Sequence, residues 1–141
     1  MKRYLVAVDG SESASNALEH AIDCARATAP AEIHVLHVVP PIESAELRIY
    51  SQRDDIAAVM REANQRVLAD AVDQVKAAGI PQAGHLLDGK IADTIAQFAD
   101  RQNMDGIVMG TRGLGMLGAM VLGSVSSRVL HLAHVPVTFV K

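Results

Sequence analysis

Five short apolar runs alternate along the chain with longer stretches whose apolar residues recur at helical spacing. The runs are continuous rather than alternating, which is typical of strands buried on both faces. They are followed by turns or helical stretches and cover residues 4–8, 33–39, 83–87, 106–110 and 135–140. The order β-α-β-α-β-α-β-α-β predicts a parallel sheet with right-handed crossovers and helices on both faces. We therefore expect residues 1–141 to form a single three-layer α/β domain.

The intervening stretches predict four helices. Apolar residues at helical spacing mark segments near 14–25, 53–78, 91–99 and 124–133. Ser11 or Ser13 is placed to cap the first of them, and Gly79 and Pro81 end the long second one. Residues 42–54 are polar and mixed, and they predict a loop or a loosely held helical turn.

Composition excludes several functional classes. Aromatic residues make up only 3% of the chain, which argues against binding nucleic acid by base stacking. Cys24 is the single cysteine, so the chain has no intramolecular disulfide and no multi-cysteine zinc site. Because no apolar stretch approaches the roughly 20 residues that span a bilayer, we expect no membrane insertion. The short apolar run at the N-terminus does not fit a signal peptide, so a cytoplasmic protein is expected.

Charge is unevenly distributed, although the net charge is only −3. All 16 carboxylates lie between Asp9 and Asp105, and the last 36 residues contain six of the ten glycines. A glycine-rich stretch without carboxylates lets an anion approach the backbone without repulsion. Taken alone, this distribution favours the simpler explanation that a buried helix and strand exclude charge.

Parallel sheets bind ligands beyond the carboxyl ends of their strands. The segments that follow the predicted strands here include Asp9-Gly10-Ser11, Asp88-Gly89 and Gly110-Thr111-Arg112-Gly113. The last of these is the richest in glycine. It opens a long glycine-rich segment and is the first place to look for a phosphate site.

Two common phosphate motifs do not fit this segment. Gly113-x-Gly115-x-x-Gly118 matches the dinucleotide-binding pattern formally, but that pattern needs an acidic residue about 20 positions later. No acidic residue follows Asp105. A P-loop requires Gly-Lys-Ser or Gly-Lys-Thr, and neither tripeptide occurs in the chain.

The remaining pattern is Gly110-x2-Gly113-x9-Gly123-Ser124. Its first two glycines free the backbone after a strand, and Gly123-Ser124 begins the final helix. Backbone N–H groups at that helix start, with the hydroxyls of Ser124 and Ser126, would form a phosphate cradle that needs no lysine.

This spacing resembles the ATP-binding signature of the nucleotide-binding branch of the universal stress protein family. The first strand and turn, 6–11, and the closing Val135-Pro136-Val137 are similar as well, so the resemblance covers essentially the whole chain. It implies an adenine nucleotide alpha hydrolase-like fold with a five-stranded parallel sheet in the order 3-2-1-4-5. It also implies a homodimer that pairs through the last strand, here Val135–Val140. Lys90-Ile91 departs from the acid-Pro or polar-Pro pair frequent in the family.

The resemblance also implies an ATP site. Ala7 and Asp9 would border the adenosine, and Val38 and Met109 would flank the adenine. The ribose and phosphates would meet Gly110, Arg112, Gly113, Gly123, Ser124, Val125 and Ser126. Because Asp9 would repel a triphosphate, Mg²⁺ or Mn²⁺ is implied between them, with Asp9 as its ligand. An aspartate after a strand is also a common turn former, and Arg112 fits a solvated loop charge equally well.

The expected function is an ATP-dependent regulator of a stress response, acting as a homodimer on an unknown protein partner. No residue of the carboxylate-free C-terminal stretch can orient a nucleophile at the γ-phosphate, so we expect no catalytic residues and at most slow ATP hydrolysis. The alternatives are a slow ATPase and a dimeric interaction module that binds no nucleotide. AMP and cyclic AMP remain open as ligands, because they would share the adenosine contacts.

Overall fold

Five parallel strands form the centre of the molecule. The computed structural model describes residues 1–112 and 122–141, so the predicted site residue Gly113 lies outside the described residues. The strands are β1 (Lys2–Ala7), β2 (Ala31–Val39), β3 (Gln82–Asp88), β4 (Gly106–Gly110) and β5 (Val137–Val140). They are hydrogen-bonded in the order β3-β2-β1-β4-β5. The α/β class and the predicted strand order are thereby confirmed.

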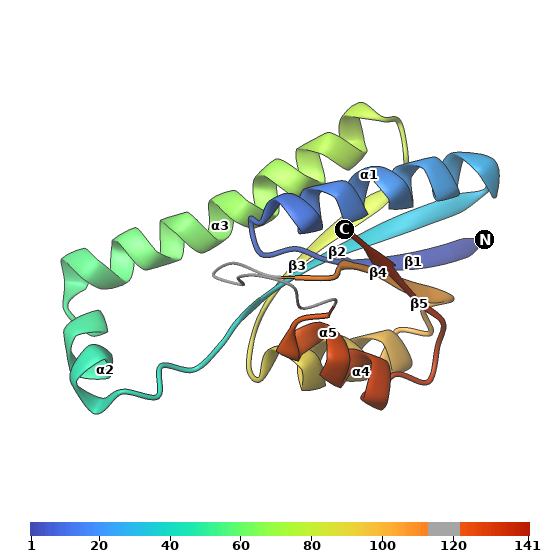
Figure 1. Ribbon diagram of the computed structural model, residues 1–141. Coiled ribbons are helices and arrows are strands. Elements are labelled where there is room, and N and C mark those ends of the chain that lie inside the picture. The colour runs from blue at the N-terminus through green and yellow to red at the C-terminus, as the bar shows by residue number, and fades with distance from the viewer. Residues whose placement is uncertain (113–121) are drawn as a thin grey trace.

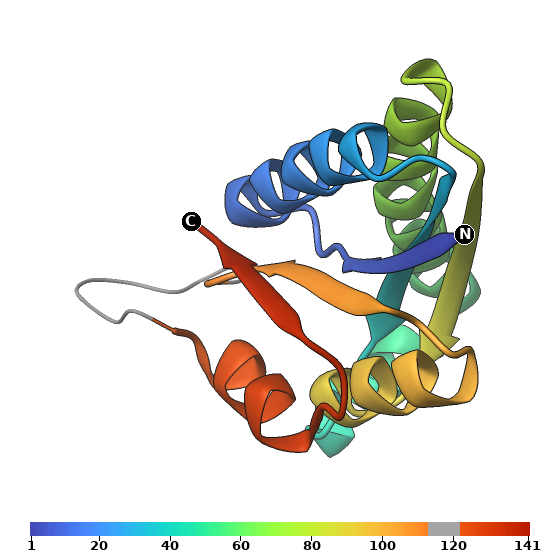
Figure 2. The ribbon, with the colours of Figure 1, turned by 90° about the vertical axis from the view of Figure 1, so that its right-hand side faces the viewer.

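Helices cover both faces of the sheet (Figures 1 and 2). One face carries α1 (Glu12–Ala27) and α3 (Asp54–Ala77), and the other carries α4 (Ile91–Arg101) and α5 (Ser124–Leu132). Residues 42–54, which predicted a loop or a helical turn, contain the seven-residue helix α2 (Ala45–Ser51). None of the helices within the described ranges is long and apolar enough to cross a membrane.

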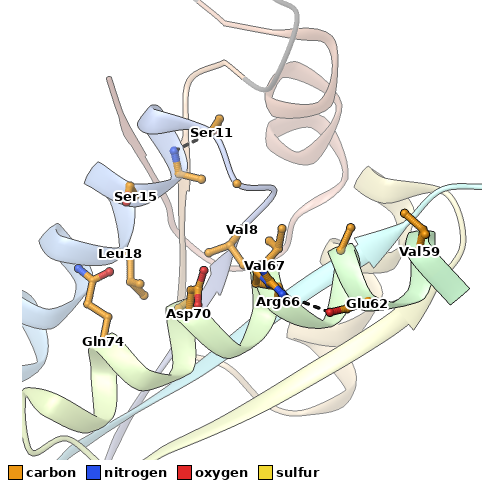
Figure 3. A pocket seen from close by; sticks show the side chains of 14 residues that line it. Val8, Ser11, Ser15, Leu18, Val59, Glu62, Arg66, Val67, Asp70 and Gln74 are labelled. Carbon is orange, nitrogen blue, oxygen red and sulfur yellow. Dashed lines mark hydrogen bonds and ion pairs between the residues drawn. The ribbon is translucent and has the colours of Figure 1, made fainter.

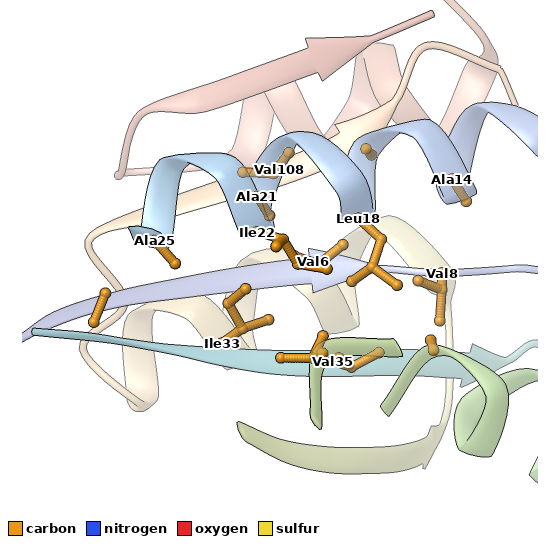
Figure 4. Packing of buried hydrophobic residues seen from close by; sticks show 14 residues of the cluster. Val6, Val8, Ala14, Leu18, Ala21, Ile22, Ala25, Ile33, Val35 and Val108 are labelled. Carbon is orange, nitrogen blue, oxygen red and sulfur yellow. The ribbon is translucent and has the colours of Figure 1, made fainter. Parts of the chain in front are cut away.

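Each face of the sheet has its own hydrophobic core. The core beneath α1 includes the fully buried Val6, Ala17, Ile33 and Val35, and Figure 4 shows α1 packed on β1 and β2. The core on the other face contains Leu5, Leu36, Val38, Ile95, Ile107 and Met109. Successive strand residues therefore enter opposite cores, which explains why the apolar runs in the sequence are continuous.

The hairpin of α2 and the first half of α3 extends beyond the sheet (Figure 1). No residue of α2 is buried, and the buried residues of α3 are Ala71 and Val75, both in its second half. Large apolar side chains are exposed on this hairpin at Leu47, Ile49, Tyr50, Val59 and Met60. Because α2 buries none of its side chains, its main local signal is the Ser44 cap, whose Oγ accepts the Leu47 N–H at 3.3 Å.

Two histidines stack between β2 and β3. The rings of His34 and His85 lie 5.2 Å apart, and His34 Nδ1 is 3.0 Å from His85 Nε2. His34 Nε2 faces Glu32 Oε1 at 3.2 Å, and Phe98 of α4 packs against His85. Burial and, to a smaller extent, the nearby His34 charge lower the pKa of His85 below its ordinary value of 6.5.

The lowered pKa predicts that the fold weakens in mild acid. Because the unfolded chain binds this proton more readily, His85 stabilises the fold fully above about pH 6.5 and less as the pH falls through its folded pKa. Urea unfolding at about pH 7.5 and 5.5 measures the change in free energy of unfolding. We expect a smaller change for His85→Gln than for the wild type. Equal changes in the two proteins would contradict this role of His85.

Candidate functional site

A cavity lies at the carboxyl ends of β1, β2 and β4, closed by α4 and the start of α5. Ten of the eleven predicted site residues lie within the described ranges, and eight of these ten line it: Ala7, Asp9, Val38, Met109, Gly110, Arg112, Val125 and Ser126. Gly123 and Ser124 stand beside Val125 at the start of α5 but do not line the cavity. The cavity volume is about 80 Å³, below the roughly 300–1,000 Å³ of drug-sized sites, so the described residues enclose only part of such a ligand.

The turn from β1 into α1 forms one wall. Asp9 Oδ1 accepts the Ser11 N–H at 2.9 Å, and Ser11 Oγ caps α1 by accepting the Ala14 N–H at 3.2 Å. Between them Gly10 has a φ of +85°, in the left-handed region that favours glycine. Asp9 is thus a turn former, as one of its two interpretations predicted, and it is also one of the residues that line the cavity.

Gly110 allows β4 and α1 to come very close. A Cβ at this position would lie 1.9 Å from Ser13 Oγ, 2.9 Å from the Ser13 carbonyl carbon and 3.0 Å from the Ala14 nitrogen. Ser13 Oγ also accepts the Arg112 N–H at 3.4 Å and donates to the Val140 carbonyl at 3.4 Å. Ser13 therefore joins α1 to the ends of β4 and β5 directly beside the cavity.

The start of α5 faces the end of β4. The first intrahelical bond runs from the Ser127 N–H to the Gly123 carbonyl at 2.9 Å, which leaves the N–H groups of Ser124, Val125 and Ser126 without an intrahelical acceptor. The Gly123 N–H donates to the Thr111 carbonyl at 2.7 Å. The Ser126 hydroxyl, predicted to face phosphates, donates to the Gly110 carbonyl at 2.8 Å and is buried. Its observed contact ties α5 to β4.

The opposite wall of the cavity is apolar. Val38 and Met109, predicted to flank an adenine, are joined there by Leu36 and by Ile91 and Ile95 of α4. Sequence reasoning missed the two isoleucines as site residues, although their four-residue spacing had marked one face of a helix. The Lys90-Ile91 pair, which departs from the family pattern, thus contributes Ile91 to this wall.

A larger cavity of about 560 Å³ lies between α1 and α3 on the other face of the sheet (Figure 3). Val8, Leu18 and Val67 contribute to its apolar lining, and the exposed Glu62 and Arg66 form an ion pair of 3.2 Å on α3. None of the ten predicted site residues within the described ranges lines it. We assign the candidate site to the smaller cavity, because the strand ends and the glycine motif converge there.

The described residues contain no group of three or more histidine, cysteine, aspartate or glutamate side chains placed to hold a metal ion. Asp9 supplies the one carboxylate among the described residues that line the smaller cavity. Mg²⁺ is commonly held by one or two carboxylates together with substrate phosphates. Within the described residues, a single carboxylate near the start of α5 therefore fits a metal that arrives with a phosphate ligand, rather than a site built by protein alone.

The chain matches known proteins along its whole length. The model of the Universal stress protein family matches residues 1–141. A universal stress protein of Methanocaldococcus jannaschii is 32% identical over 140 residues, which cover 99% of this chain and 82% of that protein.

Two solved structures share its fold. The universal stress protein of Archaeoglobus fulgidus in complex with dAMP has a TM-score of 0.73, 27% identity and coverage of 100% and 98% of the two chains. An Arabidopsis thaliana family protein with AMP bound has a TM-score of 0.70, 25% identity and coverage of 100% and 92%. With the family match over every residue and the β3-β2-β1-β4-β5 sheet, this chain belongs to the Universal stress protein family.

Proposed function

We propose that the cavity binds the adenosine part of ATP and that the start of α5 binds its phosphates. The observation that carries the proposal is the convergence of eight residues, separated by up to 119 positions from Ala7 to Ser126, on one cavity. Relatives from Archaeoglobus fulgidus and Arabidopsis thaliana with the same fold were solved with dAMP and AMP. Both ligands carry the adenine group that this apolar wall would accept.

Each part of the cavity suits one part of the nucleotide. The adenine would lie between Val38 and Met109, whose flexible thioether adapts to a flat ring. The N–H groups of Ser124, Val125 and Ser126, which have no intrahelical acceptor, would donate to phosphate oxygens at the positive end of the helix dipole. The Arg112 guanidinium, two residues after the end of β4, would add a charge-assisted contact to the phosphates.

Mg²⁺ or Mn²⁺ would accompany the phosphates. Asp9 Oδ1 is engaged by the Ser11 N–H, and a carboxylate retains further lone pairs for a cation. Bound beside Asp9, the cation would neutralise repulsion between this carboxylate and the phosphates. It would thus make triphosphate binding depend on metal.

Phosphate number tests the role assigned to α5. We expect nucleotide-stripped protein to bind ATP with Mg²⁺ about tenfold or more tightly than AMP, because the charge-assisted contacts at α5 and Arg112 each add to affinity. Isothermal titration with both nucleotides measures this ratio. Equal affinities would remove the phosphate role of the α5 start and leave an adenosine-binding site.

The function that follows is nucleotide-dependent regulation rather than catalysis. Within the described residues the cavity offers one carboxylate, Asp9, and the proposal assigns it to the metal. No side chain there is left to orient a water molecule at the γ-phosphate, so hydrolysis is expected to be slow. An interaction module without nucleotide is the second candidate, favoured by the exposed apolar side chains of α2 and α3.

We further propose a homodimer through β5. This strand is at the sheet edge and carries Val137-Thr138-Phe139-Val140 without a charge. An uncharged edge strand invites pairing with another chain. Sedimentation at about 10 μM protein is expected to give a dimer, within the micromolar range of specific association. A monomer at that concentration would contradict pairing through this edge.

A further inference from the structure

β2 carries one buried histidine at the level where β1 ends. His37 is 7% exposed, and its ring contacts Asn64 of α3, on the face of the sheet that carries α1 and α3 (Figure 1). Its Nδ1 is 2.8 Å from the Val8 carbonyl oxygen, and its Nε2 is 2.8 Å from Asn64 Oδ1 on α3. Because a carbonyl oxygen only accepts hydrogen bonds, the ring donates from Nδ1 to Val8.

Val8 is the point at which β1 leaves the sheet. Its N–H donates to the Leu36 carbonyl at 2.9 Å, which continues the pairing of β1 with β2. Its carbonyl belongs to the peptide unit that joins Val8 to Asp9, and the His37 ring holds that carbonyl. The hydrogen bond therefore fixes the orientation of the peptide unit that precedes the Asp9 Cα, which carries the carboxylate side chain.

Asn64 faces the other nitrogen of the ring. Its Nδ2 donates to the Met60 carbonyl at 3.0 Å, one turn earlier on α3, and this bond points Oδ1 toward His37. The ring thus lies between the end of β1 and α3. Gly10, in the same turn as Asp9, also lies against α3, since a Cβ there would be 3.5 Å from Val67 Cγ2.

We propose that His37 is a positioning residue of the nucleotide site. It does not line the cavity, and it acts by donating to the Val8 carbonyl, so that Asp9 leaves β1 in the direction of the cavity. The expected effect of His37 on ATP binding rests on the proposed nucleotide function. The contact with Val8 predicts that residues 8–14 are ordered whether or not a nucleotide is bound.

Two substitutions separate the bond to Val8 from general packing. The asparagine of His37→Asn can place an N–H where Nδ1 stands, whereas the longer glutamine of His37→Gln reaches toward Asn64 instead. Val75→Ala is the matched control, because Val75 is fully buried in the same core and does not line the cavity. The control measures what a loss of stability alone does to binding.

Titration with ATP and Mg²⁺ gives the first result. We expect His37→Gln to bind about tenfold more weakly than wild type, because a buried carbonyl loses its donor. His37→Asn keeps a donor for the Val8 carbonyl, and Val75→Ala lies away from that contact. Both variants are therefore expected to bind ATP within about threefold of wild type.

Amide hydrogen exchange of the ligand-free proteins gives the second result. Residues 8–14 are expected to exchange about tenfold faster in His37→Gln than in His37→Asn or Val75→Ala, since only the first loses the local bond. If the variants show this pattern of exchange but the wild type binds no ATP, the role of His37 in ordering residues 8–14 would be supported and the nucleotide function overturned. Equal exchange and equal ATP affinity in His37→Gln and His37→Asn would overturn the positioning role.

Discussion

Gly110→Ala is expected to abolish measurable ATP binding and to lower the free energy of unfolding by about 2–3 kcal/mol. The added Cβ would stand 1.9 Å from Ser13 Oγ, and the Ser13 side chain could turn away from this Cβ. The Ser13 carbonyl carbon and the Ala14 nitrogen, at 2.9 and 3.0 Å, belong to the backbone of α1. The start of α1 must therefore move, and the turn that carries Asp9 moves with it.

Gly106→Ala is the matched control on the same strand. A Cβ there would meet the Pro136 carbonyl oxygen at 3.6 Å and Tyr4 Cδ1 at 3.9 Å, which are ordinary contacts. Its free energy of unfolding is expected to stay within about 0.5 kcal/mol of wild type, with ATP affinity retained. Urea unfolding and titration of both variants check this pair. Wild-type binding by Gly110→Ala would show that the close approach of α1 and β4 does not shape the site.

Asp9→Asn is expected to remove the effect of the metal while preserving the turn. The asparagine oxygen can still accept the Ser11 N–H, so α1 should begin where it does in the wild type. With Mg²⁺ we expect ATP affinity to fall about tenfold or more, because a cation loses its one protein carboxylate. Without metal the affinity should stay equal or rise, because the repulsion of the phosphates is gone.

Titrations of wild type and Asp9→Asn with ATP, with and without Mg²⁺, measure whether the substitution lowers ATP affinity only when the metal is present. Circular dichroism of the two proteins is the control for folding. A loss of ATP affinity that is the same with and without metal would assign Asp9 to the ribose or to the turn, and not to a metal ion.

The fold could be predicted from the sequence because alternate residues of nearly every strand pack into the hydrophobic cores on opposite faces of the sheet. Leu5 and Val6, adjacent in β1, are both fully buried on opposite sides of the sheet, so the strand reads as a continuous apolar run. The helix α2 was left open because it buries no residue and offers no periodic apolar face. β5 begins at Val137 rather than Val135, and the Pro136 carbonyl accepts the Ile107 N–H just ahead of the strand.

The candidate site was only partly predictable. Residues at the strand ends could be named, because a parallel sheet brings those ends to one edge. Ile91 and Ile95 reach the cavity from the helix after β3, and that contact depends on how α4 crosses the sheet. Likewise, the Ser126 hydroxyl meets a main-chain oxygen, the Gly110 carbonyl, which no side-chain pattern encodes.

Glycine gave the clearest signal for the site, but not the reason for it. The spacing of Gly110 and Gly123 suggested a phosphate loop, whereas the structure explains Gly110 by its contact with Ser13 of α1. Close packing between elements far apart in the chain cannot be inferred from one sequence. It becomes visible only when the positions of α1 and β4 are known.

Calorimetric titration of nucleotide-stripped protein with ATP, with and without Mg²⁺, tests the central proposal most directly. We expect one site per chain with a micromolar dissociation constant, corresponding to a binding free energy of about −8 kcal/mol, and weaker binding when the metal is chelated. The absence of binding heat at millimolar ATP, together with no thermal stabilisation, would contradict it. The cavity would then hold no nucleotide, and the chain would act through its surfaces alone.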